Sequence, residues 1–181
     1  MKYSILAFLL VAFSAAAIVS AHGQSAPSAY KGSLSVEVGG IGSMFQPDYA
    51  GGTASSNHLY GLGAYGDVRI SRWEQVEVEA RWLHFNQTLG IYENTYSIGP
   101  RIPIVENFHR FTPYGKVLIG WGAMPALTGK ALMFTYGGGI DYRLSRRFTL
   151  RCIDYEFQQW RVSPNDLWPN GASVGISYRI F

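Results

Sequence analysis

Most of the chain alternates between apolar and polar or small residues with a period of two. Between residues 134 and 144, every second position except Gly138 is aromatic or aliphatic, and the positions between them are threonine, glycine, aspartate and arginine. The same alternation recurs at 60–70, 76–82, 116–122 and 172–180. We find no sustained 3.6-residue period of the kind that marks an amphipathic helix. The pattern therefore predicts β-strands with one apolar face and one polar face.

Three further segments complete a set of eight strands but depart from simple alternation. Strands are expected at 34–46 and 92–104. In the second of these, Pro100 and Pro103 donate no ladder hydrogen bond, so a bulge or an early end is expected there. The third segment, 148–160, changes parity, which means that its apolar and polar faces exchange partway along.

The change of parity lies near Cys152. Leu150 and Cys152 share one face, whereas Ile153 and Tyr155 share the other. A β-bulge near Cys152 would re-aim the chain in this way. Without a bulge, Arg151 would lie on the apolar face and reach water only at its edge, and the sequence leaves both arrangements open.

The N-terminus reads as a secretory signal peptide. Lys2 precedes an almost wholly apolar run at 5–18 that ends in small residues, as signal peptides do. The run is shorter than the roughly 20 residues of a membrane helix. Cleavage is expected after Ala21, with Ala26 as the alternative. The expected organisation is a signal peptide at 1–21, a loose periplasmic segment at 22–32 and a strand domain at 33–181.

Composition narrows the class of protein. Only 15% of the 181 residues are charged, while 21 are glycine and 15% are aromatic. The apolar content argues against disorder. The net charge of +3 is too small and too evenly spread for nucleic-acid binding. The mean hydropathy is too low for a bundle of membrane helices. One cysteine, Cys152, excludes an internal disulfide framework and a multi-cysteine zinc site.

The charged residues share the polar face of the strands, and this decides which side faces the solvent. A charge on the lipid face of a barrel costs about 2–4 kcal/mol at the bilayer midplane, and an eight-stranded lumen is only just wide enough for side chains. We therefore expect a paired, lumenal charge network, whereas a soluble barrel would carry its charges outside. Its members are Glu37, Asp67, Arg69, Glu77, Glu79, Arg81, Glu93, Arg101, Lys116, Asp141, Arg143, Asp154, Glu156 and Arg179, joined by Arg151 if the bulge is present.

The connections alternate between short (71–74, 105–110, 145–147) and mostly longer ones (47–57, 86–91, 124–131, 161–170). Short turns on one side and long loops on the other are typical of outer-membrane barrels. The predicted fold is all-β, an eight-stranded antiparallel up-and-down transmembrane β-barrel. Two interfacial aromatic girdles are expected, Trp73, Phe111 and Phe148 beside the turns and Tyr60, Trp82, Trp121, Phe134 and Trp160 beside the loops.

The C-terminal segment looks like the assembly signal of bacterial outer-membrane barrels, with a polar residue, a glycine two later, and alternate hydrophobic or aromatic residues near the end. The residues that match are Ser173, Gly175, Tyr178, Ile180 and Phe181. Together with the signal peptide and the strands, this segment makes the chain resemble the OmpA/OmpX-type small outer-membrane β-barrel family. We expect no peptidoglycan-binding domain after Phe181 and therefore no cell-wall tether.

The resemblance implies insertion into the bacterial outer membrane with both termini in the periplasm. The expected partners are the barrel-assembly machinery, which would recognise the last strand by β-augmentation, and outer-membrane lipid and lipopolysaccharide. We expect a monomer that binds no nucleic acid.

Catalytic and metal-binding patterns are weak in this sequence. None of the histidines is followed two residues later by serine, as a lipid A deacylase of this class requires, and no histidine pair has ligand spacing. His58, Asp48 and either Ser55 or Ser56 could be read as a triad, but a polar loop contains such residues by default. We expect a non-enzymatic surface protein with a plugged lumen and no cofactor. The alternatives are a small or gated pore, an adhesin acting through 47–57 and 161–170, and a lipid A-modifying enzyme.

Overall fold

The computed structural model describes residues 34–48, 58–70, 74–85, 92–104, 110–125 and 127–180. The expected signal peptide at 1–21, the segment at 22–32, Trp73 and Phe181 lie outside these ranges. None of the described residues belongs to a helix that is long and apolar enough to cross a membrane.

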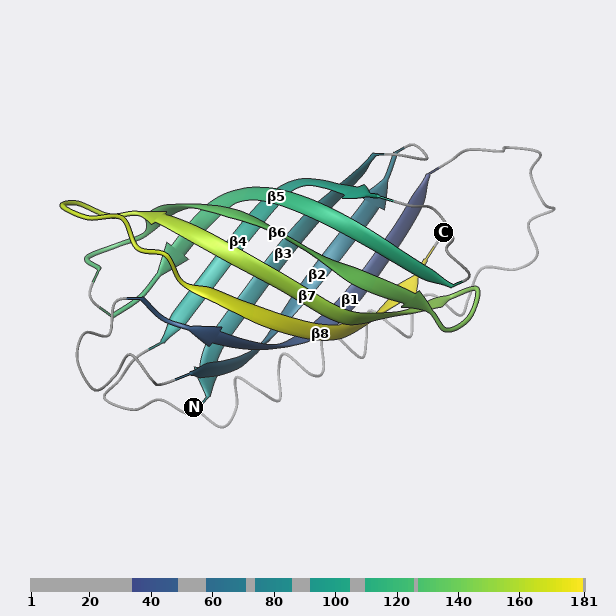
Figure 1. Ribbon diagram of the computed structural model, residues 1–181, viewed down its shortest axis with the longest axis horizontal. Coiled ribbons are helices and arrows are strands. Elements are labelled where there is room, and N and C mark those ends of the chain that lie inside the picture. The colour runs from purple at the N-terminus through teal and green to yellow at the C-terminus, as the bar shows by residue number, and fades with distance from the viewer. Residues whose placement is uncertain are drawn as a thin grey trace, which may run out of the picture. The chain divides into compact units, whose positions relative to one another are not determined.

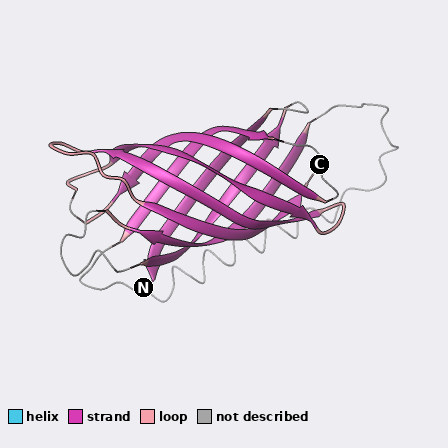
Figure 2. Cartoon of the chain, viewed as in Figure 1, coloured by secondary structure: helices cyan, strands magenta, loops and turns pink. Residues whose placement is uncertain are grey.

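Eight antiparallel strands form a closed barrel, as predicted (Figure 1). Each strand pairs with its neighbours in the chain, and β1 pairs with β8 to close the sheet. The strands run obliquely around the barrel (Figure 2). Their bounds are β1 Ser35–Gln46, β2 Leu59–Arg69, β3 Gln75–Phe85, β4 Glu93–Pro103, β5 Phe111–Ala123, β6 Ala131–Arg143, β7 Phe148–Arg161 and β8 Asn170–Arg179.

The barrel has two different ends, which we name by their connections. The turn end carries the β6–β7 turn at 144–147, the start of β1 and the end of β8. The loop end carries the β5–β6 and β7–β8 connections at 124–130 and 162–169, and the second of these projects beyond the strands in Figure 1.

Alternation along each strand separates an apolar outer wall from a polar lumen. Val78, Ile98 and Val117 are about half exposed on the outside, while Glu77, Thr95 and Lys116 on the inside are buried. Arg143 and Arg161, both at strand ends, are the exposed charged residues among the strand positions that the structure describes. At the positions whose burial the structure describes, the outer wall between the strand ends is therefore free of exposed charge, as the hydrocarbon region requires.

A bulge interrupts β7 where the sequence changes parity. The register with β8 shifts between Arg151 and Asp154, and opposite β6, Ile140 pairs with Ile153 while Asp141 pairs with Arg151. Cys152 is the extra residue, so Arg151 and Asp154 both point inward. Of the two arrangements that the sequence leaves open, the structure has the one with the bulge, and Arg151 lies in the lumen.

The prolines of β4 do not produce a bulge, so that expectation is wrong. Ile98 pairs with Ile119 and Arg101 pairs with Lys116, which is one unbroken register, and the strand continues to Pro103. A missing amide donor leaves a gap in the ladder, but it does not by itself displace the chain.

Lumen-facing glycines allow close approach of neighbouring strands. A Cβ added at Gly120 would lie 1.9 Å from the carbonyl oxygen of Tyr96 on β4. At Gly42, on the outer side of β1, an added Cβ would meet no atom within 4 Å. Glycine is therefore required at position 120 for steric reasons that do not apply at position 42.

Candidate functional site in the charged lumen

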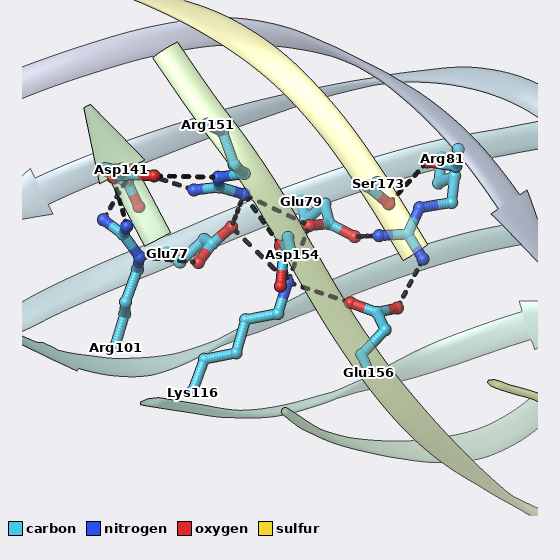
Figure 3. Close-up of polar contacts among 12 residues, drawn as sticks. Glu77, Glu79, Arg81, Arg101, Lys116, Asp141, Arg151, Asp154, Glu156 and Ser173 are labelled. Atoms are coloured by element: carbon cyan, nitrogen blue, oxygen red, sulfur yellow. Dashed lines mark hydrogen bonds and ion pairs between the residues drawn. The ribbon is translucent and has the colours of Figure 1, made fainter. Parts of the chain in front are cut away.

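Inward positions of six neighbouring strands place their charged side chains in the middle of the lumen (Figure 3). We call this set the central network. The strands β2 to β7 contribute to it in turn, and all its side chains except Asp141 are buried. Its members are Asp67, Glu77, Glu79, Arg81, Arg101, Lys116, Asp141, Arg151, Asp154 and Glu156.

Arg151 is the cation that touches most of the network. Its Nη1 donates to Glu77 at 2.7 Å and to Asp154 at 3.2 Å, and its Nη2 donates to Asp67 at 3.4 Å. The guanidinium lies 3.8 Å from the centre of the Tyr65 ring, a cation–π contact. The bulge at Cys152 places this side chain where it joins carboxylates from β2, β3 and β7.

Lys116 joins the other half of the network. Its Nζ lies 2.6 Å from Asp154, 2.9 Å from Glu156 and 3.3 Å from Glu79. An ammonium group has three donors and no acceptor, and these three carboxylates surround it. Burial of the Lys116 charge is therefore compensated by direct ion pairs.

Arg81 and Arg101 flank the network along the barrel axis. Arg81 pairs with Glu79 and Glu156, and its guanidinium lies 4.5 Å from the ring centre of Phe45. Arg101 pairs with Asp141 and reaches Asp67 at 3.4 Å. It also lies 3.5 Å from the ring centre of Tyr114. Aromatic faces thus cover the parts of the guanidinium groups that donate no hydrogen bonds.

The central network holds more carboxylates than bases, six against four. Oxygens of Glu77, Glu79 and Asp154 lie within 4.8 Å of one another, a spacing that could hold a metal ion. The Lys116 ammonium and the Arg151 guanidinium lie among these same oxygens. The positive charge that a metal ion would supply is already provided by the Lys116 and Arg151 side chains.

At the turn end, a smaller polar group follows the central network. Arg179 donates to Glu37 from Nη2 at 2.6 Å and from Nε at 2.9 Å, and Ser177 donates to the same carboxylate at 3.0 Å. A cavity of about 20 Å³ lies here, and half-buried Arg69 contributes to its lining. That volume is enough for about one water molecule.

Arg143, expected in the lumenal network, also lines this cavity, but its side chain is exposed. Its inward parity is as expected, but β6 ends at this residue. The lumen meets solvent there, and the long side chain extends into it.

At the loop end, the lumen is filled by apolar side chains. Met124, Ala131, Met133 and Trp160 form one buried cluster. Phe45, Leu59 and Leu83 form a second, and Glu93, which pairs with Leu83 across the sheet, is also fully buried. We call the first cluster the apolar stopper.

Trp160 belongs to the apolar stopper and not to an aromatic girdle, which corrects the prediction from its place beside a loop. It is fully buried and faces inward like Glu156 and Gln158. Its Nε1 donates to Gln158 at 2.8 Å, and Gln158 donates to Glu156 at 2.9 Å. A Cβ at Gly122 would lie 2.2 Å from the Trp160 ring. Strand parity and this opposing glycine are the signals that identify an inward tryptophan.

The other described girdle residues face outward. Phe111 and Phe148 are exposed at the turn end, while Tyr60, Trp82 and Trp121 are exposed toward the loop end. Phe134 is half-buried on the same outer face.

The C-terminal segment occupies β8 between β7 and β1. Ser173 and Gly175 face the lumen, where the Ser173 hydroxyl hydrogen-bonds that of Ser43 at 2.8 Å. Tyr178 packs edge-on against Phe148 and accepts a hydrogen bond from Arg147 at 2.9 Å, while Ile180 is exposed. In the closed barrel this strand is paired on both sides, so any recognition by assembly machinery would precede closure.

Comparisons with known proteins agree with this geometry. The family described as outer membrane protein beta-barrel domain matches residues 5–179. No curated protein matches the chain. The N-terminal β-barrel domain of Pseudomonas aeruginosa OprF is 14% identical, with a TM-score of 0.51, over 81% of this chain and 97% of that one.

Two other solved structures are similar. Neisserial surface protein A is 11% identical, with a TM-score of 0.54, over 81% of this chain and 96% of its own. A transmembrane β-barrel designed de novo is 16% identical, with a TM-score of 0.52, over 81% and 95%. At these identities the likeness shows the fold alone, because one fold carries many functions.

Proposed function

Because the chain belongs to the family of outer membrane protein beta-barrel domains, we propose that it is a non-enzymatic barrel whose lumen is closed by its own side chains. Its location is the bacterial outer membrane. Its role would be that of a structural membrane protein that presents loops at the cell surface.

The observation that carries the proposal is the filling of the lumen. The turn-end pair of Glu37 and Arg179, the central network and the apolar stopper follow one another along the axis. Buried ions without partners are strongly unfavourable, so each cation in the network holds its neighbouring carboxylates in place. A solute would have to displace several ion pairs to pass.

A small or gated pore is the second candidate, favoured by the surplus of two carboxylates in the central network. Planar-bilayer recording of the purified barrel separates the two functions. We expect no channel events over a range of voltages. Discrete, voltage-reproducible openings would overturn the plugged-lumen proposal, while the barrel itself would stand.

The loop end supports a surface role. The 162–169 connection folds back onto the barrel, because the Trp168 amide donates to the Asp48 carboxylate at 2.8 Å and Leu167 pairs with Trp160. Arg161 pairs with Asp166 in the same connection. With the loop end outward and both termini in the periplasm, this structured connection would face the surroundings of the cell.

Membrane fractionation with a heat-modifiability gel tests the proposed placement. The protein should be in the outer-membrane fraction and migrate faster unboiled than boiled. Unchanged lipid A mass spectra on overexpression are expected of a non-enzyme, and a new lipid A species would overturn that part of the proposal.

A further inference from the structure

Positive charge is concentrated at the turn end of the barrel. The described arginines there outnumber the carboxylates Glu37 and Glu74, whereas the described bases at the loop end, Lys130 and Arg161, are outnumbered by Asp48, Glu93 and Asp166. The turn-end arginines are Arg69, Arg110, Arg143, Arg146, Arg147 and Arg179. The surplus is therefore local to one rim of the barrel.

Three of these arginines line one pocket. Arg110, Arg143 and Arg146, with Leu144 and Ser145, surround an open pocket of about 380 Å³. The Arg143 amide donates to the Arg110 carbonyl at 2.9 Å, which brings the start of β5 and the end of β6 together. Within the part of the chain that the structure describes, none of the three guanidinium groups forms an ion pair.

The pocket borders the apolar outer wall. Leu144 is 45% exposed and is itself part of the lining, and Ile104 and Phe111 nearby are 65% and 44% exposed. Phe111 packs against Tyr142 with 4.8 Å between ring centres. The pocket thus combines guanidinium donors with an adjoining surface for hydrocarbon.

We propose that this pocket binds the phosphate headgroup of an anionic glycerophospholipid, whose acyl chains lie along Leu144 and Phe111. Arginine donates two parallel hydrogen bonds to phosphate oxygens, and several guanidinium groups without carboxylate partners match a phosphodiester in charge. The proposal rests on the placement of the barrel in a membrane proposed above. Beyond that placement, the turn end would bind anionic lipids in preference to lipids without net charge.

Native mass spectrometry of the detergent-solubilised full-length barrel tests this site. The protein is titrated with phosphatidylglycerol or with phosphatidylcholine of the same acyl chains. We expect phosphatidylglycerol adducts on the native barrel and a loss of about tenfold or more in their apparent affinity in the double variant R143Q/R146Q. R161Q, which removes an exposed arginine at the opposite end of the barrel, is the control and should bind phosphatidylglycerol as the native protein does.

Several outcomes would overturn the proposal. These are equal phosphatidylglycerol binding by R143Q/R146Q and the native barrel, equal binding of the two lipids, and displacement of the lipid by inorganic phosphate, which would indicate a free-anion site. A heat-modifiability gel run on each variant shows whether the barrel is folded. Failure of lipid binding in a folded barrel therefore contradicts this site and leaves the membrane placement intact.

Discussion

At the scale of single residues, Arg151 shows how a buried charge holds the lumen together. It is fully buried and contacts carboxylates of three strands. Removing one partner of a buried ion pair leaves the others uncompensated, which is more damaging than never having had the pair. The contribution of Arg151 therefore depends on its partners and not on its own exposure.

Replacing Arg151 by methionine should lower the free energy of unfolding by about 3–5 kcal/mol, because Glu77 and Asp67 would stay buried without this cation. Urea unfolding of the refolded barrel in detergent, followed by the heat-modifiability shift, measures the change. Arg161→Met in the same strand is the control. Arg161 is 59% exposed and pairs with Asp166 at 3.3 Å, so a change of at most about 1 kcal/mol is expected. Equal losses in both variants would contradict the role of Arg151.

Strand parity predicted which side of the barrel a residue faces, and the prediction failed where another cue replaced parity. Asp154 and Glu156 were placed inward by parity and are buried. Trp160 has the same parity, but its nearness to a loop suggested a girdle, and the structure buries it against Gly122. Arg143 has inward parity as well, yet its side chain is exposed because parity does not show where the lumen ends.

At the scale of the strand, the bulge in β7 lets one chain keep two charged segments inside. Leu150 and Ile153 lie on the outer wall of the barrel, while Arg151 and Asp154 face the lumen. A regular strand would have to place either Arg151 or the segment that contains Asp154 and Glu156 against lipid. The extra residue is therefore needed for the fold and not tolerated as a defect.

Deleting Cys152 should prevent formation of the barrel, because one half of β7 would turn its charges outward. The expected observation is loss of the fast-migrating unboiled band. Cys152→Ala keeps the extra residue and should retain that band, so a folded deletion variant would contradict this account of the bulge.

Gly120→Ala should lower the free energy of unfolding by about 1–3 kcal/mol, since the new methyl would overlap the Tyr96 carbonyl on the adjacent strand. Gly42→Ala places its methyl in open space and should change stability by no more than about 0.5 kcal/mol. The two urea midpoints test this directly. A similar midpoint for both variants would show that the strands can move apart at Gly120.

Strand existence was predictable from alternation, whereas strand irregularity was predictable only in part. The parity change around Cys152 marked its bulge because it exchanged apolar and charged residues. Pro100 and Pro103 suggested a second bulge that is absent, since a missing donor leaves the side-chain alternation of β4 intact. Registers between strands depend on contacts that no single strand contains.

At the scale of the whole molecule, the sorting of charge to the inside and hydrocarbon to the outside fixes the membrane as the solvent. The same sorting does not show which end faces outward. The proposed orientation has the loop end at the cell surface and the turn end in the periplasm.

Thiol labelling of intact cells tests the orientation. In a Cys152→Ala background, a cysteine at Thr128 in the 124–130 connection should react with a membrane-impermeant maleimide. A cysteine at Arg146 in the β6–β7 turn should react only after the outer membrane is disrupted. Both side chains are exposed in the folded barrel, so the reverse result would mean that the barrel is inserted the other way round.

Because of the apolar stopper, the two mouths of the barrel differ in the access that they give to water. Water can reach Asp141, which is 14% exposed, through the polar turn end. At the loop end it meets Met124, Met133 and Trp160 first. In the proposed orientation, the polar interior is therefore open to water from the periplasm, while the apolar stopper closes it on the side of the cell surface.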